Sequence, residues 1–478
     1  MPERRIYLLS PRELSPETIA VTFAKTSRSP DSFREIAAGL SDEQSARFHE
    51  KWVVGYGHAS VAEHAVLHLA LEQISRLAVE SVESNRLASY TEKSTRYQKW
   101  DPDAYYVPVE LEGAVPQAEY MRVCRLLFET YLAALEPVKN VVVERTTRRE
   151  QETDEALDRR IRSQYVDACR FLLPAAALAN VGMTANARVL EHAIRKMLSH
   201  ELQEVRDIGE QVKTVARLEV PTLVKYADAV PYNIELSREL DEAAKVMSSP
   251  NTGASAISCD LVEYDRLGES RVLAAALYQH SGASFAEALR QVEGLDPAGR
   301  EELARVLLGK RAEHDIPARE LEYCNYVFDL VMDQGAYAEF KRHRMMSQTP
   351  QRLTTRLGYS TPSLVVDAGM QEAYAGAMRA ASDCFEQIAA LSPQVAQYVV
   401  PNGCHRRVLA QFNLREAYAF CELRSAPNAH FSIRLVAERV AEEIRRVHPL
   451  LSRYMRLPAE TPAQVAKLHF ASTRAPDQ

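Results

Sequence analysis

The chain has 478 residues, of which 46% are hydrophobic and 26% are charged, and its formal net charge is −7. This length predicts roughly two to four domains, and the acidic balance excludes a general electrostatic surface for nucleic acid or acidic membranes. The seven cysteines are scattered and form no CxxC pair, which favours a reducing compartment. The N-terminus resembles no secretory signal, and no apolar stretch approaches the roughly 20 residues that span a bilayer. We therefore expect a cytoplasmic protein.

The first predicted helices introduce an internal repeat of about half the chain. The segment TFAKTSRSPDSFREIAAGL (22–40) aligns with ALYQHSGASFAEALRQVEGL (276–295). Each is followed by a charged helical segment that ends just before a histidine, His58 in the first half and His314 in the second. Self-similarity at a fixed period is the first feature to seek in a sequence because it decides the domain organisation.

Later landmarks keep the same order and spacing. Pro174 precedes Asn186 by twelve residues, and Pro401 precedes Asn413 by twelve. The triplets that begin at these asparagines, NAR and NLR, each open a predicted amphipathic helix. One such match could arise by chance, but the ordered series indicates a tandem duplication.

The Ser-, Pro- and Gly-containing stretch SSPNTGASA (248–256) is typical of a linker. We therefore predict an N-terminal domain over 1–245, a linker over 246–256 and a C-terminal domain over 257–478. With 17 glycines and many helical stretches, an α/β (α+β) domain in each half, a twisted sheet with several long helices, fits better than an all-β domain.

Within the first half, residues 64–72 (HAVLHLALE) are short and apolar, which predicts a strand. Residues 114–136 and 154–172 have helical periodicity, and the second of these begins with acidic residues and runs up to a proline. The charged run 143–162 is interpreted as a solvated helical face.

Known nucleotide and hydrolase motifs are absent, since the sequence contains no GxxxxGK[ST], GxGxxG, HExxH or GxSxG. His58, Glu63, His64 and His68 form a tempting cluster, but they lack a complete ligand set at a standard spacing. Structural histidines are the simpler interpretation, and we assign no metal site.

A polar stretch follows, NRLASYTEKSTRYQKW (85–100), which contains Ser89, Glu92, Ser94 and Arg96. An arginine suits a phosphate, and hydroxyls with a carboxylate suit a base or sugar. Taken alone, this stretch is equally typical of a polar loop.

Its surroundings change that interpretation. The segments GHASVAEHAVLHLALEQISR, NRLASYTEKSTRY, RFLLP, NAR and HELQEVR resemble, in order and spacing, the flavin-dependent thymidylate synthase family. That family's signature is RHRxxSxNExSxRY, and residues 84–97 (SNRLASYTEKSTRY) match its second half. Ser84 and Asn85 replace the first Arg and His of the signature, and Thr91 replaces its Asn.

The second half shows the complementary pattern. RHRMMSQTPQRLTTR (342–356) retains the Arg-His-Arg triplet, but Pro350 and Arg352 replace the Glu and Ser of the signature. Residues 413–434 resemble the family's C-terminal helices, with Arg424 on a substrate-binding arginine that the first half replaces by Arg195 or Lys196. Arg170 falls on another substrate-binding arginine, where the second half has Gln397.

By resemblance, the protein binds FAD and methylates dUMP to dTMP with methylenetetrahydrofolate and NADPH. The resemblance implies cofactor binding by a first set of residues: Arg342, His343, Arg344, His58, Asn186, Arg188, Asn413 and Arg415. It implies substrate binding by Glu92, Ser94, Arg96, Arg170 and Arg424, of which Ser94 and Arg424 are assigned a catalytic part.

Members of this family are homotetramers whose sites lie between subunits, so a duplicated chain is expected to form a homodimer that imitates the tetramer. Complementary losses then leave one composite site built from both halves. Three alternatives remain: a related flavin-dependent alkylation of another pyrimidine nucleotide, a non-catalytic paralogue that only binds flavin or nucleotide, and a structural helical protein.

Overall fold

The computed structural model describes residues 5–55, 57–96, 100–247 and 256–472. The chain forms two compact units. Unit 1 comprises Met1–Ser94, Ala104–Gln117 and Ala176–Pro250, and unit 2 comprises Thr95–Asp103, Ala118–Ala175 and Asn251–Gln478. Within the described ranges, no helix is long and apolar enough to cross a membrane.

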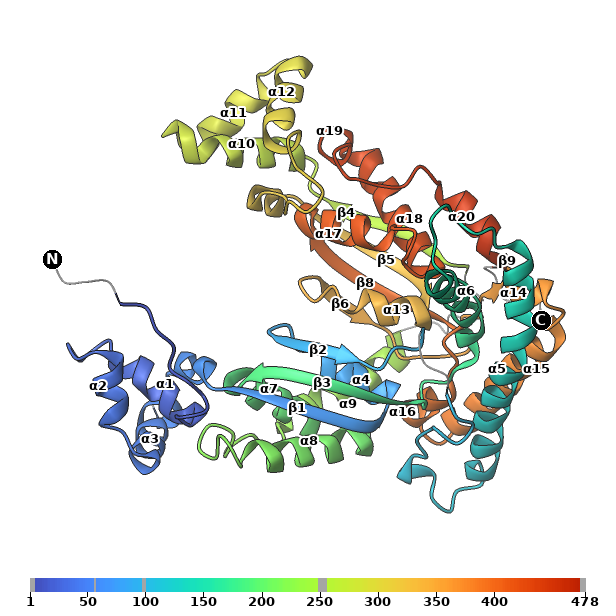
Figure 1. The fold of residues 1–478 in the computed structure, drawn as a ribbon, viewed down its shortest axis with the longest axis horizontal. Helices are drawn as coiled ribbons and strands as arrows, with labels where there is room; N and C mark the ends of the chain where they lie inside the picture. Colours follow the sequence, from blue (N-terminus) through green and yellow to red (C-terminus); the bar gives the residue numbers. More distant parts are fainter. Residues whose placement is uncertain (1–4, 56, 97–99, 248–255, 473–478) are drawn as a thin grey trace. The chain divides into compact units, whose positions relative to one another are not determined.

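Unit 1 is built on a three-stranded antiparallel sheet in the order β1-β3-β2. Its strands are β1 (Val66–Ser75), β2 (Ala88–Glu92) and β3 (Leu178–Asn186). The strand predicted at 64–72 is confirmed, although it begins two residues later because 59–64 form a 3-10 turn. Helices lie along this sheet (Figure 1), namely α4 (Arg76–Glu83), α7 (Ala187–Leu198) and α8 (Gln203–Ala216).

The helical segments predicted at the start of the first repeat are confirmed. They are α1 (Pro16–Lys25), α2 (Phe33–Ala38) and α3 (Asp42–Phe48), followed by the π-helix η1 (His49–Gly55) and the 3-10 helix η2 (Ala59–His64). Serine side chains cap the first three helices, which explains why each begins where a Ser-x-x-polar pattern stands in the sequence. Two further elements complete unit 1, the 3-10 helix η3 (Val109–Leu111) and α9 (Pro231–Met247).

Unit 2 contains a four-stranded antiparallel sheet in the order β4-β5-β8-β6. Its strands are β4 (Ser258–Tyr264), β5 (Asn325–Asp333), β6 (Ser347–Pro350) and β8 (His405–Asn413). The central part repeats unit 1, since β5, β8 and β6 follow the same order as β1, β3 and β2. Phe328 on β5 stacks on Phe412 of β8 with ring centroids 5.3 Å apart, and both side chains belong to the hydrophobic core.

The helices of the second repeat also follow the order of the first. They are α10 (Gly268–Ser281), α11 (Phe285–Glu293), α12 (Pro297–Leu308), the 3-10 helix η5 (Arg319–Tyr323), α13 (Gln334–Phe340), α17 (Leu414–Arg424) and α18 (Phe431–Val447). The remaining elements are β7 (Thr361–Pro362), α14 (Ser363–Asp367), α15 (Gln371–Ala389), α16 (Pro393–Ala396), η6 (Gln397–Val399), α19 (Pro449–Ser452), α20 (Pro462–His469) and β9 (Phe470–Ser472).

The duplication extends to individual side-chain contacts. Asn186 caps α7 by accepting from the Val189 amide at 3.0 Å, and Asn413 caps α17 by accepting from the Glu416 amide at 2.9 Å. Two residues later in each copy, an arginine pairs with a glutamate of a 3-10 helix earlier in the same repeat. Arg188 pairs with Glu63 of η2, and Arg415 pairs with Glu322, which lies between Arg319 and Tyr323 in η5. The predicted amphipathic helices after NAR and NLR are therefore confirmed.

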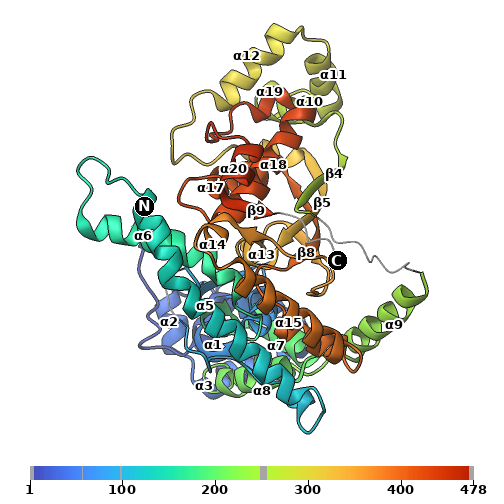
Figure 2. The ribbon, with the colours of Figure 1, turned by 90° about the vertical axis from the view of Figure 1, so that its right-hand side faces the viewer.

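Part of the first repeat packs with the second. Helix α5 (Gln117–Arg145), helix α6 (Asp154–Cys169) and the 3-10 helix η4 (Arg170–Leu172) lie almost wholly in unit 2. Figures 1 and 2 both show α15 beside α5. The compact units thus divide the chain differently from the sequence repeats. The predicted boundaries at 1–245 and 257–478 stay a prediction, and most of the predicted linker, 248–255, lies outside the described residues.

A local two-fold relation accompanies this packing. Pro174 and Pro401, which are equivalent in the two repeats, face each other in an antiparallel bridge. The Ala175 amide donates to the Val400 carbonyl at 2.9 Å, and the Asn402 amide donates to the Leu173 carbonyl at 2.9 Å. The same surface of each copy therefore meets the other, as in an isologous interface.

The predicted helical face over 143–162 is wrong in part. Helix α5 ends at Arg145 and α6 begins at Asp154, so residues 146–153 form a connection. The Thr153 hydroxyl accepts from the Ala156 amide and starts a new helix, while Gln151 has a φ of 61°, which interrupts any continuous one. Charged residues are frequent both in the two helices and in the connection between them, so the composition did not reveal the break.

Candidate functional site

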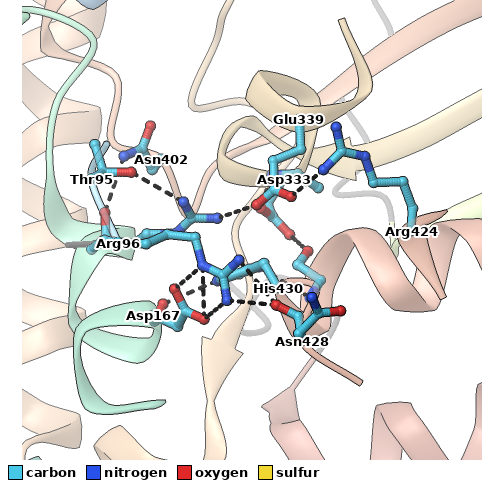
Figure 3. Close-up of polar contacts among 12 residues, drawn as sticks. Thr95, Arg96, Asp167, Asp333, Glu339, Asn402, Arg424, Asn428 and His430 are labelled. Atoms are coloured by element: carbon cyan, nitrogen blue, oxygen red, sulfur yellow. Dashed lines mark hydrogen bonds and ion pairs between the residues drawn. The ribbon is translucent and has the colours of Figure 1, made fainter. Parts of the chain in front are cut away.

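Three arginines predicted to bind the nucleotide, Arg96, Arg170 and Arg424, lie in unit 2. Figure 3 shows Arg96 and Arg424 within a network of polar contacts. Arg170 donates through Nη2 to Oε1 of Glu339 at 3.3 Å, and Arg424 donates through Nη1 to Oε2 of the same carboxylate at 3.0 Å. Glu339 therefore bridges an arginine of the first repeat and an arginine of the second.

The bridge is buried. Arg170 is 4% exposed and Glu339 is 7% exposed. Arg170 also donates to the Thr95 hydroxyl at 3.0 Å, and its own carbonyl accepts from the Asn402 side chain at 3.1 Å. Because buried charges require partners, Thr95 and Glu339 hold the two terminal nitrogens of the guanidinium, while Asn402 holds the backbone of Arg170.

Arg96 is held by a second carboxylate. Its Nε and Nη2 donate to Asp167 at 2.9 and 2.8 Å, which is the forked geometry of a strong charge-assisted pair. The Asn428 carbonyl accepts from Arg96 Nη1 and Nη2, both at 3.2 Å. Burial raises the pKa of the Asp167 carboxyl, while Arg170 and Arg96 act in the opposite sense.

Glu339 is positioned by the start of its helix. Asp333, the last residue of β5, caps α13 by accepting from the Ala336 amide at 2.8 Å. The other carboxylate oxygen of Asp333 accepts from the Ser432 hydroxyl. Complete burial raises the pKa of Asp333 to about 6. The cap therefore fixes the start of α13 and, through this helix, the position of Glu339. The capping carboxyl group binds a proton more readily than an ordinary aspartate does.

His430 continues this network in a neutral form. Its Nδ1 accepts from the Ser432 amide at 3.2 Å, so the proton lies on Nε2, which donates to the Asp167 carbonyl at 3.2 Å. Burial lowers the pKa of His430 well below its ordinary value, with Arg170 and Arg96 acting in the same direction. A neutral imidazole here adds no further positive charge beside the arginines.

The Arg-His-Arg triplet divides its side chains between the interior and the surface. Arg342 is exposed and Arg344 is half-buried, but His343 is 8% exposed. His343 Nε2 lies 3.1 Å from Arg424 Nε, which can only donate, so His343 Nε2 must accept. Its Nδ1 then carries the proton and donates to Glu416 at 3.0 Å. His343 thereby orients Arg424.

The other predicted substrate residues, Glu92 and Ser94, belong to unit 1. Glu92 ends β2 and accepts from Arg76 Nη1 at 2.7 Å, with only 2% of its side chain exposed. Ser94 is half-buried just after this strand. Tyr97, which matches the last position of the signature, lies outside the described residues. The network of unit 2 thus unites three of the five predicted substrate residues.

Among the predicted cofactor residues, Asn186 and Asn413 are helix caps, and Arg188 and Arg415 form the ion pairs described above. His58 is exposed and lines a cavity of about 690 Å³ in unit 1. Trp52, Phe48 and Phe23 supply aromatic walls to this cavity, and Arg28 lies 4.8 Å from the centre of the Trp52 ring. A planar aromatic ligand with a negative group suits such a lining.

Sequence reasoning missed Glu339, Asp167, Asp333 and His430. The first two gave no usable signal, because Glu339 pairs with Arg170 and Arg424 and Asp167 pairs with Arg96, all distant in the sequence. No sequence pattern indicated that Asp333 and His430 would both contact Ser432. Across the residues that the structure describes, no three His, Cys, Asp or Glu side chains are grouped as metal ligands would be.

Comparison with known proteins decides the family. The family model described as thymidylate synthase complementing protein, Thy1, matches this chain twice, over residues 11–222 and 260–450. The chain belongs to the Thy1 family. Its two matches confirm the tandem duplication of Thy1 domains that the sequence predicts, and each Thy1 domain has the mixed helix and sheet content described above.

Relatives fall into two groups. A UPF0159 protein of Chlamydia muridarum is 30% identical over 91% of this chain and 85% of its own length, so the tandem form of the Thy1 family is shared. A flavin-dependent thymidylate synthase of Clostridium tetani is 27% identical over 45% of this chain and 82% of its own length. A solved structure of the UMP/dUMP methylase PolB from Streptomyces cacaoi, bound with 5-Br dUMP, has 20% identity, covers 42% of this chain and 94% of its own, and has a TM-score of 0.34.

The raised pKa of Asp333 predicts a pH-dependent stability. The ordinary pKa is 3.8 and burial raises it to about 6, so the folded protein holds a proton that the unfolded chain loses first. The resulting stabilisation is complete below about pH 4 and is lost as the pH rises through about 6. Its full amplitude is about 3 kcal/mol, at roughly 1.4 kcal/mol per pKa unit.

Denaturant titrations between about pH 4 and 7 measure this effect, and Asp333→Asn should flatten the fall in unfolding free energy because an amide can still accept from Ala336. Asp367→Asn, at a surface carboxylate that pairs with Arg145, is the matched control. Equal pH slopes for the wild type and Asp333→Asn would contradict the assignment.

Proposed function

We propose that this Thy1-family protein is a flavin-dependent enzyme that methylates a uridine nucleotide, converting dUMP to dTMP with methylenetetrahydrofolate and NADPH. The observation that carries the proposal is the network of Arg96, Arg170 and Arg424, which draws cations from both repeats around one place. Family membership and the similarity to flavin-dependent thymidylate synthases support it.

The three arginines suit a nucleotide monophosphate. A guanidinium is permanently charged and its planar fork matches phosphate oxygens. Together the three arginines would neutralise the phosphate and polarise a pyrimidine carbonyl, which favours negative charge that develops on the ring. His343 holds the Arg424 guanidinium through Nε, and the terminal nitrogen Nη1 donates to Glu339. Ser94 and Glu92 are proposed to orient the nucleotide.

The residues present fit a flavin in two places, each within one unit. Arg342 and Arg344 stand just after α13 with exposed or half-buried side chains, and they would hold the pyrophosphate of FAD. The cavity beside His58, about 690 Å³ with aromatic walls and basic residues, would accept a planar ring. His343 does not fit as a direct flavin contact because both ring nitrogens bind protein groups.

A bound reduced flavin would supply the reducing equivalents for the methyl transfer. The protein's own thiols are unsuited to begin the chemistry. Burial raises the pKa of every cysteine thiol, to about 12 at Cys324 and Cys384 and further at the other five. Since the thiolate is the nucleophile, these side chains are inert near neutral pH. The chain's part is therefore to bind, orient and polarise the nucleotide.

A second candidate is a non-catalytic protein that retains nucleotide or flavin. The observation that favours it is the pairing of each of the three arginines with a carboxylate, since an arginine satisfied by protein has less to offer a ligand. Oxidation of NADPH in the presence of FAD and dUMP separates the two candidates. A related alkylation of another pyrimidine nucleotide would share the same arginines and differ in the nucleotide that stimulates turnover.

The double substitution of Arg342→Ala and Arg344→Ala should abolish flavin retention, because it removes both cations assigned to the pyrophosphate. The measurement is the visible absorption spectrum after addition of FAD and desalting. Arg356→Ala, at a surface arginine paired with Glu386, serves as the control and should stay yellow. An unchanged flavin band in the double variant would count against the assignment.

Arg170→Ala and Ser94→Ala should each weaken dUMP binding and leave flavin in place. The loss expected at Arg170 is about tenfold or more, because a charge-assisted hydrogen bond contributes roughly 1.5–3 kcal/mol. Isothermal titration calorimetry measures the affinity, with Arg122→Ala at the exposed pair with Glu119 as control. Titration curves that match the wild type would refute the roles of both residues.

A homodimer is proposed as the assembly that completes the site. Each chain carries two Thy1 domains, so two chains would supply the four domains that four single-domain subunits supply in a homotetramer. Light scattering of the purified protein should give twice the mass of one chain. A clean monomer at micromolar concentration would remove the intersubunit version of the site, although the network within unit 2 would remain.

A further inference from the structure

Glu339 occupies an unusual position for a group next to a phosphate site. Its two carboxylate oxygens each accept from a different guanidinium, Oε1 from Arg170 and Oε2 from Arg424. Arg170 opens η4 in the first repeat and Arg424 closes α17 in the second. Two arginines that converge on one anion from separate elements form the same arrangement that binds a phosphate, whose oxygens accept from guanidinium groups in the same way.

Carboxylates already offset most of the positive charge around this position. Arg96 pairs with Asp167, while Arg170 and Arg424 share Glu339. Asp333, which caps α13, adds a further carboxyl group whose pKa is raised by burial to about 6. A phosphate monoester carries about −1.5 to −2 charges at pH 7. Such a group placed beside an ionised Glu339 would be repelled, because charges at a buried site are screened less than charges in water.

Of the carboxylates, Glu339 is the one able to give way. Asp167 binds Arg96 through two short bonds of 2.9 and 2.8 Å. Glu339 makes one bond to each arginine, at 3.3 and 3.0 Å. Its side chain is one methylene longer than that of an aspartate, and it stands in the last turn of α13, three residues before the exposed Arg342. Rotation about its side-chain torsions alone would release both guanidinium groups.

We propose that Glu339 is an internal anion that holds the place of the nucleotide phosphate and so determines which ligands the site accepts. The identification of the phosphate with that of a nucleotide rests on the proposed function. A ligand must displace the carboxylate, and an anion without a base has no other contacts to offset that cost. The same cost applies to every phosphate ligand, so only a ligand that adds interactions elsewhere still binds tightly.

Glu339→Gln tests this, since it keeps the shape and one acceptor oxygen but removes the competing charge. Titration calorimetry with inorganic phosphate, in a buffer without other multivalent anions, should show at least about tenfold tighter binding by the variant than by the wild type, a change of about 1.4 kcal/mol. dUMP should also bind at least about tenfold tighter, whereas deoxyuridine should bind equally to both proteins.

Two controls carry the same change of charge. Glu386→Gln alters a surface carboxylate that pairs with Arg356, and Glu416→Gln alters a carboxylate that contacts His343. Neither should tighten phosphate binding tenfold. Unchanged or weaker phosphate binding by Glu339→Gln overturns the proposal, and so does an equal gain for deoxyuridine, because the effect would then not concern the phosphate.

Removal of the bridging charge leaves two buried arginines uncompensated, which can prevent folding. Glu339→Ala, purified in phosphate, covers that case. Its thermal unfolding temperature should rise with phosphate concentration more steeply than that of the wild type, since the external anion replaces the carboxylate. Failure of both variants to fold in phosphate, or a phosphate-independent unfolding temperature, overturns the proposal. The phosphate measurements require no catalytic turnover. If the wild type binds dUMP but neither variant responds to phosphate more strongly than the wild type, this proposal fails while the proposed function stands.

Discussion

The pairing of buried arginines with Glu339 is the constraint on which the site depends. A guanidinium cannot lose its proton at any ordinary pH, so each one that leaves water must meet an acceptor. Arg170 and Arg424 meet the same one, and this ties η4, α13 and α17 together. The cap of α13 by Asp333 and the orientation of Arg424 by His343 both serve that contact.

Duplication explains why the contact joins the two repeats. The segment with Pro174 faces its own copy at Pro401, so η4 packs against the second repeat and brings Arg170 into unit 2. Gln397 opens η6 as Arg170 opens η4, but its amide accepts from the Leu353 amide at 3.0 Å. The second copy has thus exchanged a buried charge for a neutral group that satisfies the backbone. At this position the two copies differ in charge and keep the same secondary structure.

The sequence predicted what depends on pattern and order. The repeat, the strand near Val66 and the helices after Asn186 and Asn413 follow from periodicity and capping residues, and the structure has them. It did not predict the loop over 146–153 or the inward orientation of His343. Both depend on which partner a polar side chain finds in three dimensions, as His343 finds Glu416 seventy-three positions away. The carboxylates of the site escaped notice for the same reason.

The tautomer of His343 has a consequence for how ligands would influence one another. One ring nitrogen is bound to Arg424, while the residues on either side, Arg342 and Arg344, are those assigned to the flavin. A ligand that orders this short segment lowers the entropic cost for the second ligand that uses it. Thermodynamic reciprocity then requires that nucleotide strengthen flavin binding by the same factor as flavin strengthens nucleotide binding. Cooperativity would thus arise within three consecutive residues, without movement of one domain against another.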